Sequence, residues 1–519
     1  MVGRVLGRRP GVKCREGGPA CATDLERVDS FGTIPARRVS RSSRDSGSKR
    51  QADPLHRWEI MMPTTRYKLS KYNWSFDSDD GEGSYVFNGL SRALVALSSG
   101  ETAQLRAVKD RSAVARIDPE LRRQLVRGGF MIPEDEDEQA RLKLRYETAR
   151  FRAEALSLTV APTLDCNMRC FYCFEGEKGR QSMSIETADK LLAFVDRYLR
   201  AHALRKVSLC WFGGEPLLAL PVIERVNDGI LGICDREGFE FESRAITNGA
   251  LLDPAAARVL LRGNLSSLQI TFDGPRSAHD RTRALEGGVG SFDLILERLA
   301  ELHKAGLLKN VGIAFRVNVW RETADPVELD LLRRELIGLP WFDRSRMNIY
   351  LGHLKAYEER ADDSRYLSPA EYVRLCQSFA ASEGEEPKAR NPYPRGASLC
   401  TAVRAHSFSI GPLGEITKCW VSFGEEEEVV GSIDDLLDTE ESIPLLPEWI
   451  RWLTFNPADD PHCRGCKKLP LCMGGCPFFA RGSRDTRHIC HEGGVVAQLK
   501  RFLRSRDGVE AIGAVEGVV

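Results

Sequence analysis

Six short apolar segments separated by helical patterns, all between residues 155 and 355, constrain the fold of this chain more than any other feature. They are Leu156–Ala161, Val207–Phe212, Arg244–Thr247, Leu268–Phe272, Val311–Val319 and Met347–Leu351. Between them, Ser184–Arg200 and Phe292–Ala305 repeat apolar residues with the period of an amphipathic helix. Strands that alternate with helices form parallel βα units. The sequence therefore predicts an α/β fold in which a partial TIM-like (β/α)6 barrel spans residues 156–355.

The segments on either side of this region differ from it in composition. Residues 1–62 are basic and rich in Ser, Gly and Pro, so they predict a disordered tail or an over-long start, with a nucleic-acid-binding arm or a targeting peptide as the alternatives. Residues 63–155 predict a small α+β domain with an accessory or substrate-recognition role. Its expected elements are the strands Ser84–Phe87 and Phe130–Ile132 and the helices Ser91–Leu97 and Pro119–Val126, the last with Asp118 as N-cap. Residues 356–398 predict a linker, 399–491 a cysteine-rich module and 492–519 a C-terminal tail.

Charge and hydropathy exclude several classes of function. The chain has 74 Lys+Arg and 74 Asp+Glu residues, so no overall charge attracts it to nucleic acid or to a membrane surface. It contains no apolar run of about 18 residues, the length that a membrane-spanning helix requires. The N-terminus also lacks the apolar core of a secretory signal. We therefore expect a cytoplasmic protein that binds neither nucleic acid nor membranes.

The fifteen cysteines of the chain are unevenly placed. An odd number without a secretion signal fits a disulfide framework poorly. Three cysteines lie within residues 166–173 and seven within 400–490, which indicates two metal-binding regions in a reducing compartment. The others share no spacing, and we expect them to be tail residues or small buried hydrophobes: Cys14, Cys21, Cys210, Cys234 and Cys376.

Cys166, Cys170 and Cys173 form a CX3CX2C motif directly after the first predicted strand. Three thiolates on so short a loop can surround one soft metal centre. A closed structural zinc site takes four protein ligands, whereas three ligands leave one metal position open for chemistry. A zinc site completed by a distant residue is the alternative interpretation.

The motif, with the aromatic Tyr172 before its third cysteine, resembles the signature of the radical S-adenosylmethionine (SAM) superfamily. The resemblance implies that the three cysteines hold a 4Fe–4S cluster whose free iron chelates SAM. It further implies reductive cleavage of SAM to a 5′-deoxyadenosyl radical, which abstracts a hydrogen atom from a substrate. A reductant such as flavodoxin or ferredoxin is then an expected partner.

Later segments are similar to the SAM-binding motifs of that superfamily. Trp211-Phe-Gly-Gly-Glu-Pro resembles its GGEP motif, and Thr247-Asn248-Gly249 resembles its TNG motif. The resemblance places Glu215 at the ammonium group of SAM and Arg283 at its carboxylate, although Arg283 could instead form a surface ion pair. The full set of expected SAM contacts is Tyr172, Gly213, Gly214, Glu215, Pro216, Thr247, Asn248, Arg283 and Arg316. Asp273, after the fourth predicted strand, is expected to cap the turn that follows it.

The later cysteines strongly resemble a SPASM module, which usually holds two auxiliary iron–sulfur clusters. By that resemblance Cys463, Cys466, Cys472 and Cys490 ligate one cluster, and Cys400, Cys419 and Cys476 ligate the other. His406 is either a fourth ligand to the second set or a side chain packed in an Ala405–Ile410 strand. Without His406 as a ligand, that cluster has an open iron that could bind substrate. A pair of structural zinc ions is the alternative for the whole module.

SPASM-type enzymes mostly modify peptides or proteins, and the layout of this chain resembles that of ribosomal-peptide maturases. The resemblance implies oxidative formation of a thioether or carbon–carbon crosslink. Formylglycine formation by an anaerobic sulfatase-maturing enzyme is the alternative, but that group carries a basic Asp where this chain has Trp420. Glu175, Glu415 and Asp273 are the candidates for a substrate base. A multi-cluster electron carrier is the non-enzyme alternative, which the SAM motifs disfavour.

Overall fold

The computed structural model describes residues 66–108, 114–152, 154–173, 180–354, 363–381, 399–438, 447–481 and 494–504. The chain divides into two compact units, Met1–Pro63 and Thr64–Val519, and every described residue belongs to the second unit. The predictions for residues 1–62 and for most of the linker therefore lie outside the described residues, as do Glu175 and Cys490.

A nine-stranded sheet forms the centre of the second unit, with the order β11-β10-β9-β8-β7-β6-β12-β13-β14. Its first six strands are all parallel and follow one another in sequence. They are β6 (Leu156–Val160), β7 (Lys206–Trp211), β8 (Glu240–Thr247), β9 (Leu265–Phe272), β10 (Gly312–Val319) and β11 (Met347–His353). Each of the six predicted apolar segments forms one of these strands, so the α/β class is confirmed.

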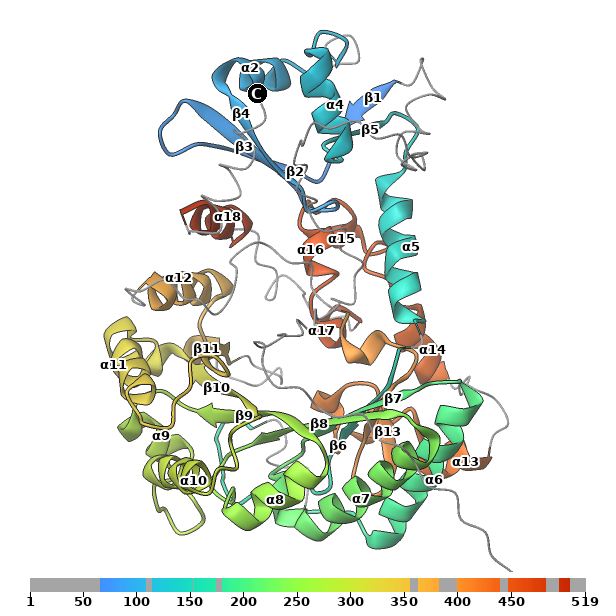
Figure 1. Cartoon of the computed structure of the whole chain (residues 1–519), viewed down its shortest axis with the longest axis vertical. Helices are drawn as coiled ribbons and strands as arrows, with labels where there is room; N and C mark the ends of the chain where they lie inside the picture. The colour runs from blue at the N-terminus through green and yellow to red at the C-terminus, as the bar shows by residue number, and fades with distance from the viewer. Residues whose placement is uncertain are drawn as a thin grey trace, which may run out of the picture. The chain divides into compact units, whose positions relative to one another are not determined.

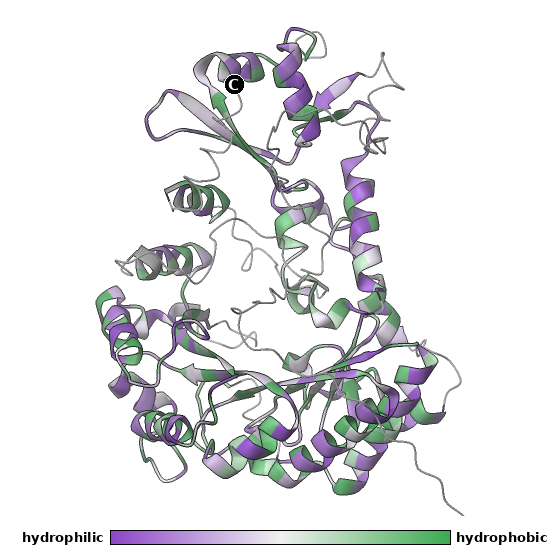
Figure 2. Ribbon diagram, viewed as in Figure 1, coloured by the Kyte–Doolittle hydropathy of each residue, from purple (hydrophilic) through white to green (hydrophobic). Residues whose placement is uncertain are grey.

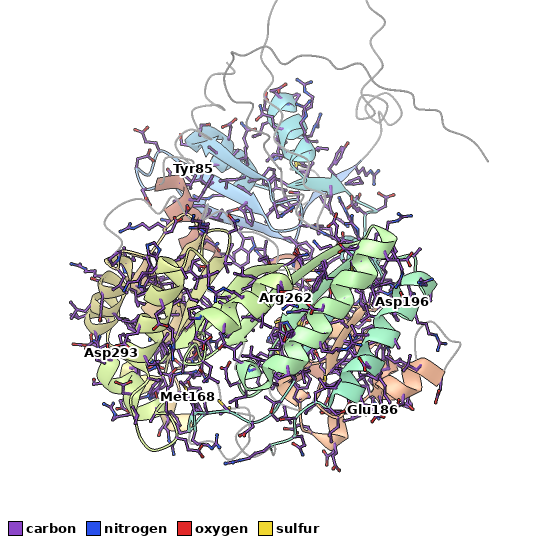
Figure 3. All side chains as sticks on the ribbon, turned by 60° about the horizontal axis from the view of Figure 1, so that its bottom comes forward. Tyr85, Met168, Glu186, Asp196, Arg262 and Asp293 are labelled. Atoms are coloured by element: carbon purple, nitrogen blue, oxygen red, sulfur yellow. The ribbon has the colours of Figure 1, made fainter. Side chains whose placement is uncertain are left out.

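Helices connect the parallel strands and cover one side of the sheet (Figure 1). They are α6 (Ile185–Ala201), α7 (Leu220–Glu237), α8 (Pro254–Arg262), α9 (Arg276–Thr282), α10 (Phe292–Lys304) and α11 (Pro326–Ile337). In Figure 2 these helices carry both apolar and polar stripes, as helices between a core and solvent do. Figure 3 labels two of the outward charged residues, Asp196 and Arg262. Arg262 forms ion pairs with Glu224 at 2.6 Å and with Asp228 at 2.5 Å.

The cysteine-rich region continues the same sheet, which the sequence did not indicate. β12 (Ser407–Ile410) pairs in parallel with β6, and Ser407 lies opposite Ser157. β13 (Glu415–Thr417) and β14 (Gly431–Ser432) then extend the sheet in antiparallel fashion. The second cysteine region is thereby joined to the strand that leads into the first. The helix α12 (Pro369–Ala381) lies in the segment predicted as a linker. The described helices of the cysteine-rich region and the chain end are α13 (Ile433–Asp438), α14 (Pro447–Thr454), α15 (Pro461–Arg464), α16 (Leu469–Cys472), α17 (Pro477–Arg481) and α18 (Gly494–Arg504).

The described residues between 66 and 150, which leave out 109–113, form two small antiparallel sheets with three helices. β1 (Tyr67–Leu69) pairs with β5 (Met131–Pro133), and β2 (Asn73–Asp77), β3 (Gly83–Asn88) and β4 (Leu94–Ser98) form the second sheet. The helices are α2 (Ser99–Arg106), α4 (Pro119–Arg127) and α5 (Glu138–Arg150). The prediction of a cap at Asp118 is confirmed, because its carboxylate accepts hydrogen bonds from Glu120 N and Leu121 N at 2.9 and 3.1 Å.

The predicted helix Ser91–Leu97 is wrong, because Leu94–Ser98 is the strand β4. Alternate residues of this segment face opposite sides of the sheet, and Leu97 packs in a buried cluster with Val86. The helix begins only after Ser98, whose side chain caps Glu101 N while the Glu101 side chain accepts from Ser98 N. This capping box was the signal in the sequence that marks the true helix start.

Arg150 ties the end of α5 to the cysteine-rich region. It is 1% exposed, and its guanidinium donates to the carbonyls of Leu453 and Phe455. We expect Arg150→Met to lower the free energy of unfolding by about 3 kcal/mol, because two charge-assisted hydrogen bonds are lost from a buried site. Urea unfolding measures the change. Arg141→Met on the same helix is the control, because Arg141 is 62% exposed, and an equal loss in both variants would contradict the prediction.

Among the described residues, no helix has both the length and the apolar character that crossing a membrane requires.

Candidate functional site

The loop after β6 carries Cys166, Cys170 and Cys173 at the carboxyl edge of the parallel strands. Among the described residues none of the three is joined in a disulfide, and Cys173 N donates to Cys170 O at 3.1 Å. Met168, labelled in Figure 3, is 3% exposed and forms an isolated antiparallel bridge with Leu285. In parallel sheets the carboxyl edge is where ligands bind.

Burial makes the thiols of Cys166 and Cys170 poor thiolates on their own. It raises the pKa of Cys166 to about 12, with further contributions from Glu215, Cys170 and Cys173. Burial also raises the pKa of Cys170. A cation within the loop would offset this cost, as iron does for thiolate ligands.

The donor set fits a 4Fe–4S cluster. In the described part of the chain, no three Cys, His, Asp or Glu side chains converge as ligands of a single metal ion. Cysteine thiolates are the ligands that hold iron–sulfur clusters, and this loop provides three of them.

The Gly-Gly-Glu turn after β7 lies directly against the backbone that leads into the thiol loop. Gly214 N donates to Thr163 O at 3.1 Å, and Glu215 N donates to Asp165 O at 2.8 Å. A Cβ atom on Gly214 would stand 2.2 Å from Asp165 O, and one on Gly213 would stand 2.4 Å from Thr163 O. Gly213 also has a φ of +116°, which favours glycine. The glycines therefore allow the close approach of two loops, and Pro216 begins a short 3-10 helix behind them.

Glu215 is completely buried and braces the ends of β7 and β8. Its carboxylate accepts hydrogen bonds from Thr247 Oγ1 at 2.7 Å, Asn248 N at 2.7 Å and Leu217 N at 3.1 Å. Burial raises the pKa of Glu215, and these hydrogen bonds oppose that shift. Two carboxylate oxygens offer about four acceptor positions, so one remains for an ammonium group.

Asn248 connects this brace to the thiol loop. Its Nδ2 donates to Asn167 Oδ1 at 2.6 Å and lies 3.8 Å from Cys166 Sγ, while its Oδ1 accepts from Ala250 N at 2.9 Å. Asn248 therefore presents a hydrogen-bond donor to the sulfur of a candidate cluster ligand, at 5% exposure.

The prediction that Asp273 caps the following turn is wrong. Its carboxylate instead anchors Tyr172. The Tyr172 hydroxyl lies 2.7 and 2.6 Å from the two carboxylate oxygens of Asp273 and donates to them. Thr282 Oγ1 at 2.8 Å and Asn318 Nδ2 at 3.1 Å complete the partners of this 0% exposed carboxylate. Tyr172 and Asp273 are 101 positions apart in the sequence, so no local pattern could indicate their contact.

Arg283 balances the charge of Asp273. Its Nη1 donates to the Tyr172 hydroxyl at 2.9 Å and lies 3.8 Å from Asp273 Oδ1. Burial raises the pKa of Tyr172 well above its usual range, and Arg283 opposes that shift. Arg283 Nε is buried without a hydrogen-bond partner among the described residues. This arginine is therefore not at the surface, and it keeps a donor for an anion.

Arg316 joins the same cluster through Asn318, whose Oδ1 accepts from Arg316 Nε at 2.7 Å. Gly352 on the neighbouring strand makes this position possible, because a Cβ there would stand 2.6 Å from Arg316 Nε. Sequence reasoning missed Gly352, since its role depends on the register of β10 and β11.

A cavity of about 530 Å³ opens beside Tyr172 and the thiol loop. It is lined by Phe171, Thr282, Trp320, Arg321, Glu322 and Arg365. The rings of Phe171 and Trp320 meet edge to face with centroids 5.6 Å apart. The cavity is open, and it combines two aromatic side chains with three charged ones. Sequence reasoning named neither Phe171 nor Trp320, since single aromatic residues have no distinctive spacing.

His279 gives this region a defined response to acid. Its Nδ1 accepts from Asp273 N at 3.3 Å, and its Nε2 lies 2.9 Å from Ser291 Oγ, which itself donates to Arg283 O. The ring is therefore neutral, and burial lowers its pKa to about 2, with Arg283 adding to the shift. A second proton, on Nδ1, would point at the N–H of Asp273, so the hydrogen bond between these two groups would be lost.

We expect stability to fall as the pH drops below about 6.5, the ordinary pKa of histidine. Below that pH the unfolded chain binds a proton at His279 while the folded chain does not, down to about pH 2. The contribution amounts to about 2 kcal/mol between pH 6.5 and 5. Urea unfolding at pH 7 and pH 5 should show a smaller acid loss in His279→Gln than in the wild type. His303→Gln, at an exposed position of α10, is the control; equal acid losses in all three proteins would contradict this assignment.

The assignment of the later cysteines to two ligand sets stays a prediction. Cys400, Cys419 and Cys476 interact electrostatically, and burial, together with these neighbours, raises the pKa of Cys400 and Cys419. Cys466 and Cys472 interact in the same way, and Cys466 N donates to Cys463 O at 3.0 Å. Their predicted fourth partner, Cys490, lies outside the described residues.

His406 packs against α6. Its Nδ1 lies 3.0 Å from the Tyr198 hydroxyl, and its ring centroid lies 5.0 Å from that of His202. Burial lowers the pKa of His406 to about 4, and His202 and Lys418 add to the shift. This placement favours the packing interpretation over that of a fourth ligand.

Glu415 and Trp420 have local roles in the structure. Glu415 Oε2 accepts from Leu413 N at 2.8 Å, within the β12–β13 turn, so this candidate base is used to close a turn. Trp420 stacks on Phe212 with centroids 5.7 Å apart and an interplanar angle of 29°. Phe212 precedes Gly213, so the residue after Cys419 contacts the glycine turn. Of the remaining cysteines, Cys210 and Cys234 are each 1% exposed, as expected of small buried hydrophobes.

By its fold and its thiol loop, the chain is an α/β protein with three cysteines close in sequence at the carboxyl edge of its parallel strands. Residues 160–328 match the family model of the radical SAM superfamily. The probable GTP 3′,8-cyclase of Methanopyrus kandleri is 35% identical over 242 residues, which cover 44% of this chain and 72% of that protein. The chain therefore belongs to the radical SAM superfamily.

Two further similarities cover most of the chain. Radical SAM cyclopropyl synthase TigE of Paramaledivibacter caminithermalis is 24% identical over 368 residues, 66% of this chain and 71% of that protein. The structure of native anSMEcpe with bound AdoMet and Cp18Cys peptide aligns with a TM-score of 0.50 at 19% identity, covering 70% of this chain and 99% of that one. The protein is thus a radical SAM enzyme whose cofactors are SAM and a 4Fe–4S cluster, and auxiliary clusters are typical of its SPASM relatives.

Proposed function

We propose that this enzyme uses reductive cleavage of SAM to modify a peptide oxidatively, forming a thioether or carbon–carbon crosslink. One observation carries the proposal: β12 pairs in parallel with β6, so the second cysteine region is joined to the strand that leads into the first. The stack of Trp420 on Phe212 joins the residue after Cys419 to the glycine turn beside Cys166. A substrate held between them has a radical source on one side and an electron acceptor on the other.

The chain's own residues divide the work at the first site. Cys166, Cys170 and Cys173 would hold the 4Fe–4S cluster, which when bound supplies the electron that breaks a C–S bond of SAM. Asn248 directs an N–H toward Cys166 Sγ and orients that ligand. Glu215 keeps one acceptor position for the SAM ammonium group, and Arg283 Nε is a free donor for its carboxylate. The open cavity beside Phe171 and Trp320 offers aromatic and charged side chains to a substrate.

The second site favours crosslinking over formylglycine formation. Formylglycine formation by the resembling enzymes uses an Asp base at the position of Trp420. The indole N–H of Trp420 can donate a proton to a hydrogen bond but cannot accept one. A peptide-bound form of a structural relative, anSMEcpe with Cp18Cys peptide, supports a peptide as the substrate.

Co-expression with short peptides encoded beside the gene tests the proposed function. Mass spectrometry should show a loss of two hydrogen atoms from one peptide, retained after thiol alkylation and absent with Cys170→Ala. Conversion of a Cys or Ser side chain of a sulfatase to an aldehyde would instead establish formylglycine formation. Unmodified peptide and sulfatase, with zinc as the sole bound metal, would contradict both.

A further inference from the structure

Lys418 is a buried lysine directly before Cys419, and burial lowers its pKa to about 7, a shift that a nearby anion opposes. It is 2% exposed, and its Nζ donates to Arg404 O at 2.8 Å and Ser407 O at 2.6 Å. The ammonium also lies 4.7 Å from the ring centroid of Trp449 and 5.7 Å from that of Phe408. Carbonyl dipoles and aromatic faces therefore surround a lysine that solvent does not reach.

This lysine differs from the other buried basic side chains that the structure describes. Arg150, Arg283 and Arg333 each form an ion pair, with Glu147, Asp273 and Asp330 respectively. Within the described ranges, no carboxylate lies at ion-pair distance from Lys418 Nζ. A buried charge without a counter-charge destabilises the fold, so an anion nearby would offset this penalty.

The thiols of Cys400, Cys419 and Cys476 are the groups that can provide this anion. Lys418 directly precedes Cys419, and its Nζ donates to the carbonyl of Arg404, four residues after Cys400. An iron–sulfur group held by thiolates carries net negative charge, and reduction by one electron makes that charge larger.

We propose that Lys418 is the fixed counter-cation of the auxiliary iron–sulfur group held by Cys400, Cys419 and Cys476, and that it raises the reduction potential of that group. The inference rests on the proposed function, because it assumes that these cysteines hold an auxiliary cluster. A cation in a low-dielectric interior stabilises the reduced form more than the oxidised form. The chain thereby sets this group apart from the one near Cys466 and Cys472. Neighbouring charge and burial are among the levers that proteins use to tune cluster potentials.

The test uses the full chain with Cys166→Ala, Cys170→Ala and Cys173→Ala, so that no SAM chemistry takes place. After anaerobic reconstitution, an electrochemical titration followed by electron paramagnetic resonance measures the auxiliary clusters. Adding Cys400→Ser to this variant identifies which redox transition in the titration belongs to the cluster that Cys400 would hold. Because the radical SAM cluster is missing, the result does not depend on whether a peptide is modified.

Lys418→Gln removes the charge but keeps a donor for the two carbonyls. At the wild-type midpoint potential, we expect the ratio of reduced to oxidised cluster to fall about tenfold, a downward shift of about 59 mV for one electron. Lys418→Arg should keep the wild-type midpoint. Lys468→Gln is the matched control: its lysine interacts with Cys472, so only the other redox transition should move.

Two outcomes would overturn the proposal. One is an unchanged midpoint in Lys418→Gln with the wild-type iron content. The other is equal loss of iron or folding in Lys418→Gln and Lys418→Arg, which would make Lys418 a packing residue. Loss of this cluster alone in Lys418→Gln, with recovery in Lys418→Arg, would support the need for the charge.

Discussion

Cys170→Ala should abolish formation of 5′-deoxyadenosine in an anaerobic mixture with SAM and dithionite. Cys170 is one of three thiols on the loop after β6, and a cubane cluster that loses a protein ligand loses its attachment. We expect a decrease of more than about 100-fold, because loss of an outer-shell partner alone costs metal sites up to that factor. The iron content should also fall by one cluster.

Cys234→Ala is the matched control for this experiment. Cys234 is a free thiol on α7 with 1% exposure, and its replacement removes a sulfur atom from the core and not from the site. It should leave SAM cleavage at the wild-type level. Full cleavage activity in Cys170→Ala would contradict the assignment of the loop as the cluster site.

Asp273→Asn should lower the free energy of unfolding by about 3–5 kcal/mol, the cost of leaving a buried charge without its partner. The substitution keeps the shape of the side chain but removes the negative charge beside Arg283, which is 8% exposed. It also weakens the acceptor of the Tyr172 hydroxyl, which lies between two cysteines of the loop. Urea unfolding of the apoprotein measures the effect without any cofactor.

Asp293→Asn provides the comparison on the surface. Asp293, labelled in Figure 3, pairs with Arg276 at 2.8 Å, but its side chain is 65% exposed. An exposed pair contributes less than about 1 kcal/mol because water and salt screen it. Similar losses of unfolding free energy in the two variants would show that the Asp273–Arg283 pair stabilises the fold no more than an exposed ion pair does.

The sequence predicted those parts of the structure that local pattern determines. The apolar runs specify the six parallel strands, and strand ends specify where Cys166, Gly213, Asn248 and Asp273 lie, because carboxyl ends share one edge of a parallel sheet. The Gly-Gly-Glu turn also follows from sequence, since two adjacent glycines before a buried carboxylate favour close loop contact.

The remaining features depend on contacts between distant segments. The partner of Tyr172 is Asp273, and Arg316 needs a glycine at position 352 of another strand. The sequence around Lys418 gives no sign that this lysine is buried. Its burial results from packing against β12 and the Trp449 ring. The error at Ser91–Leu97 had a different cause: apolar residues in a short run fit a helix or a strand, and only the pairing with β3 decides.

The pairing of β12 with β6 also has a consequence for how the chain is made. Ser157 on β6 can pair with β12 only after Ser407 has been synthesised. During synthesis the edge of β6 therefore stays unpaired until some 250 further residues have been added. At about 5–20 residues per second, that interval lasts from about 12 to 50 seconds. An open edge of this kind is a template for unwanted strand pairing. A chain truncated before β12 is therefore expected to aggregate rather than to form a smaller soluble enzyme. The yield of the folded full chain should depend on the rate of translation and on the supply of chaperones.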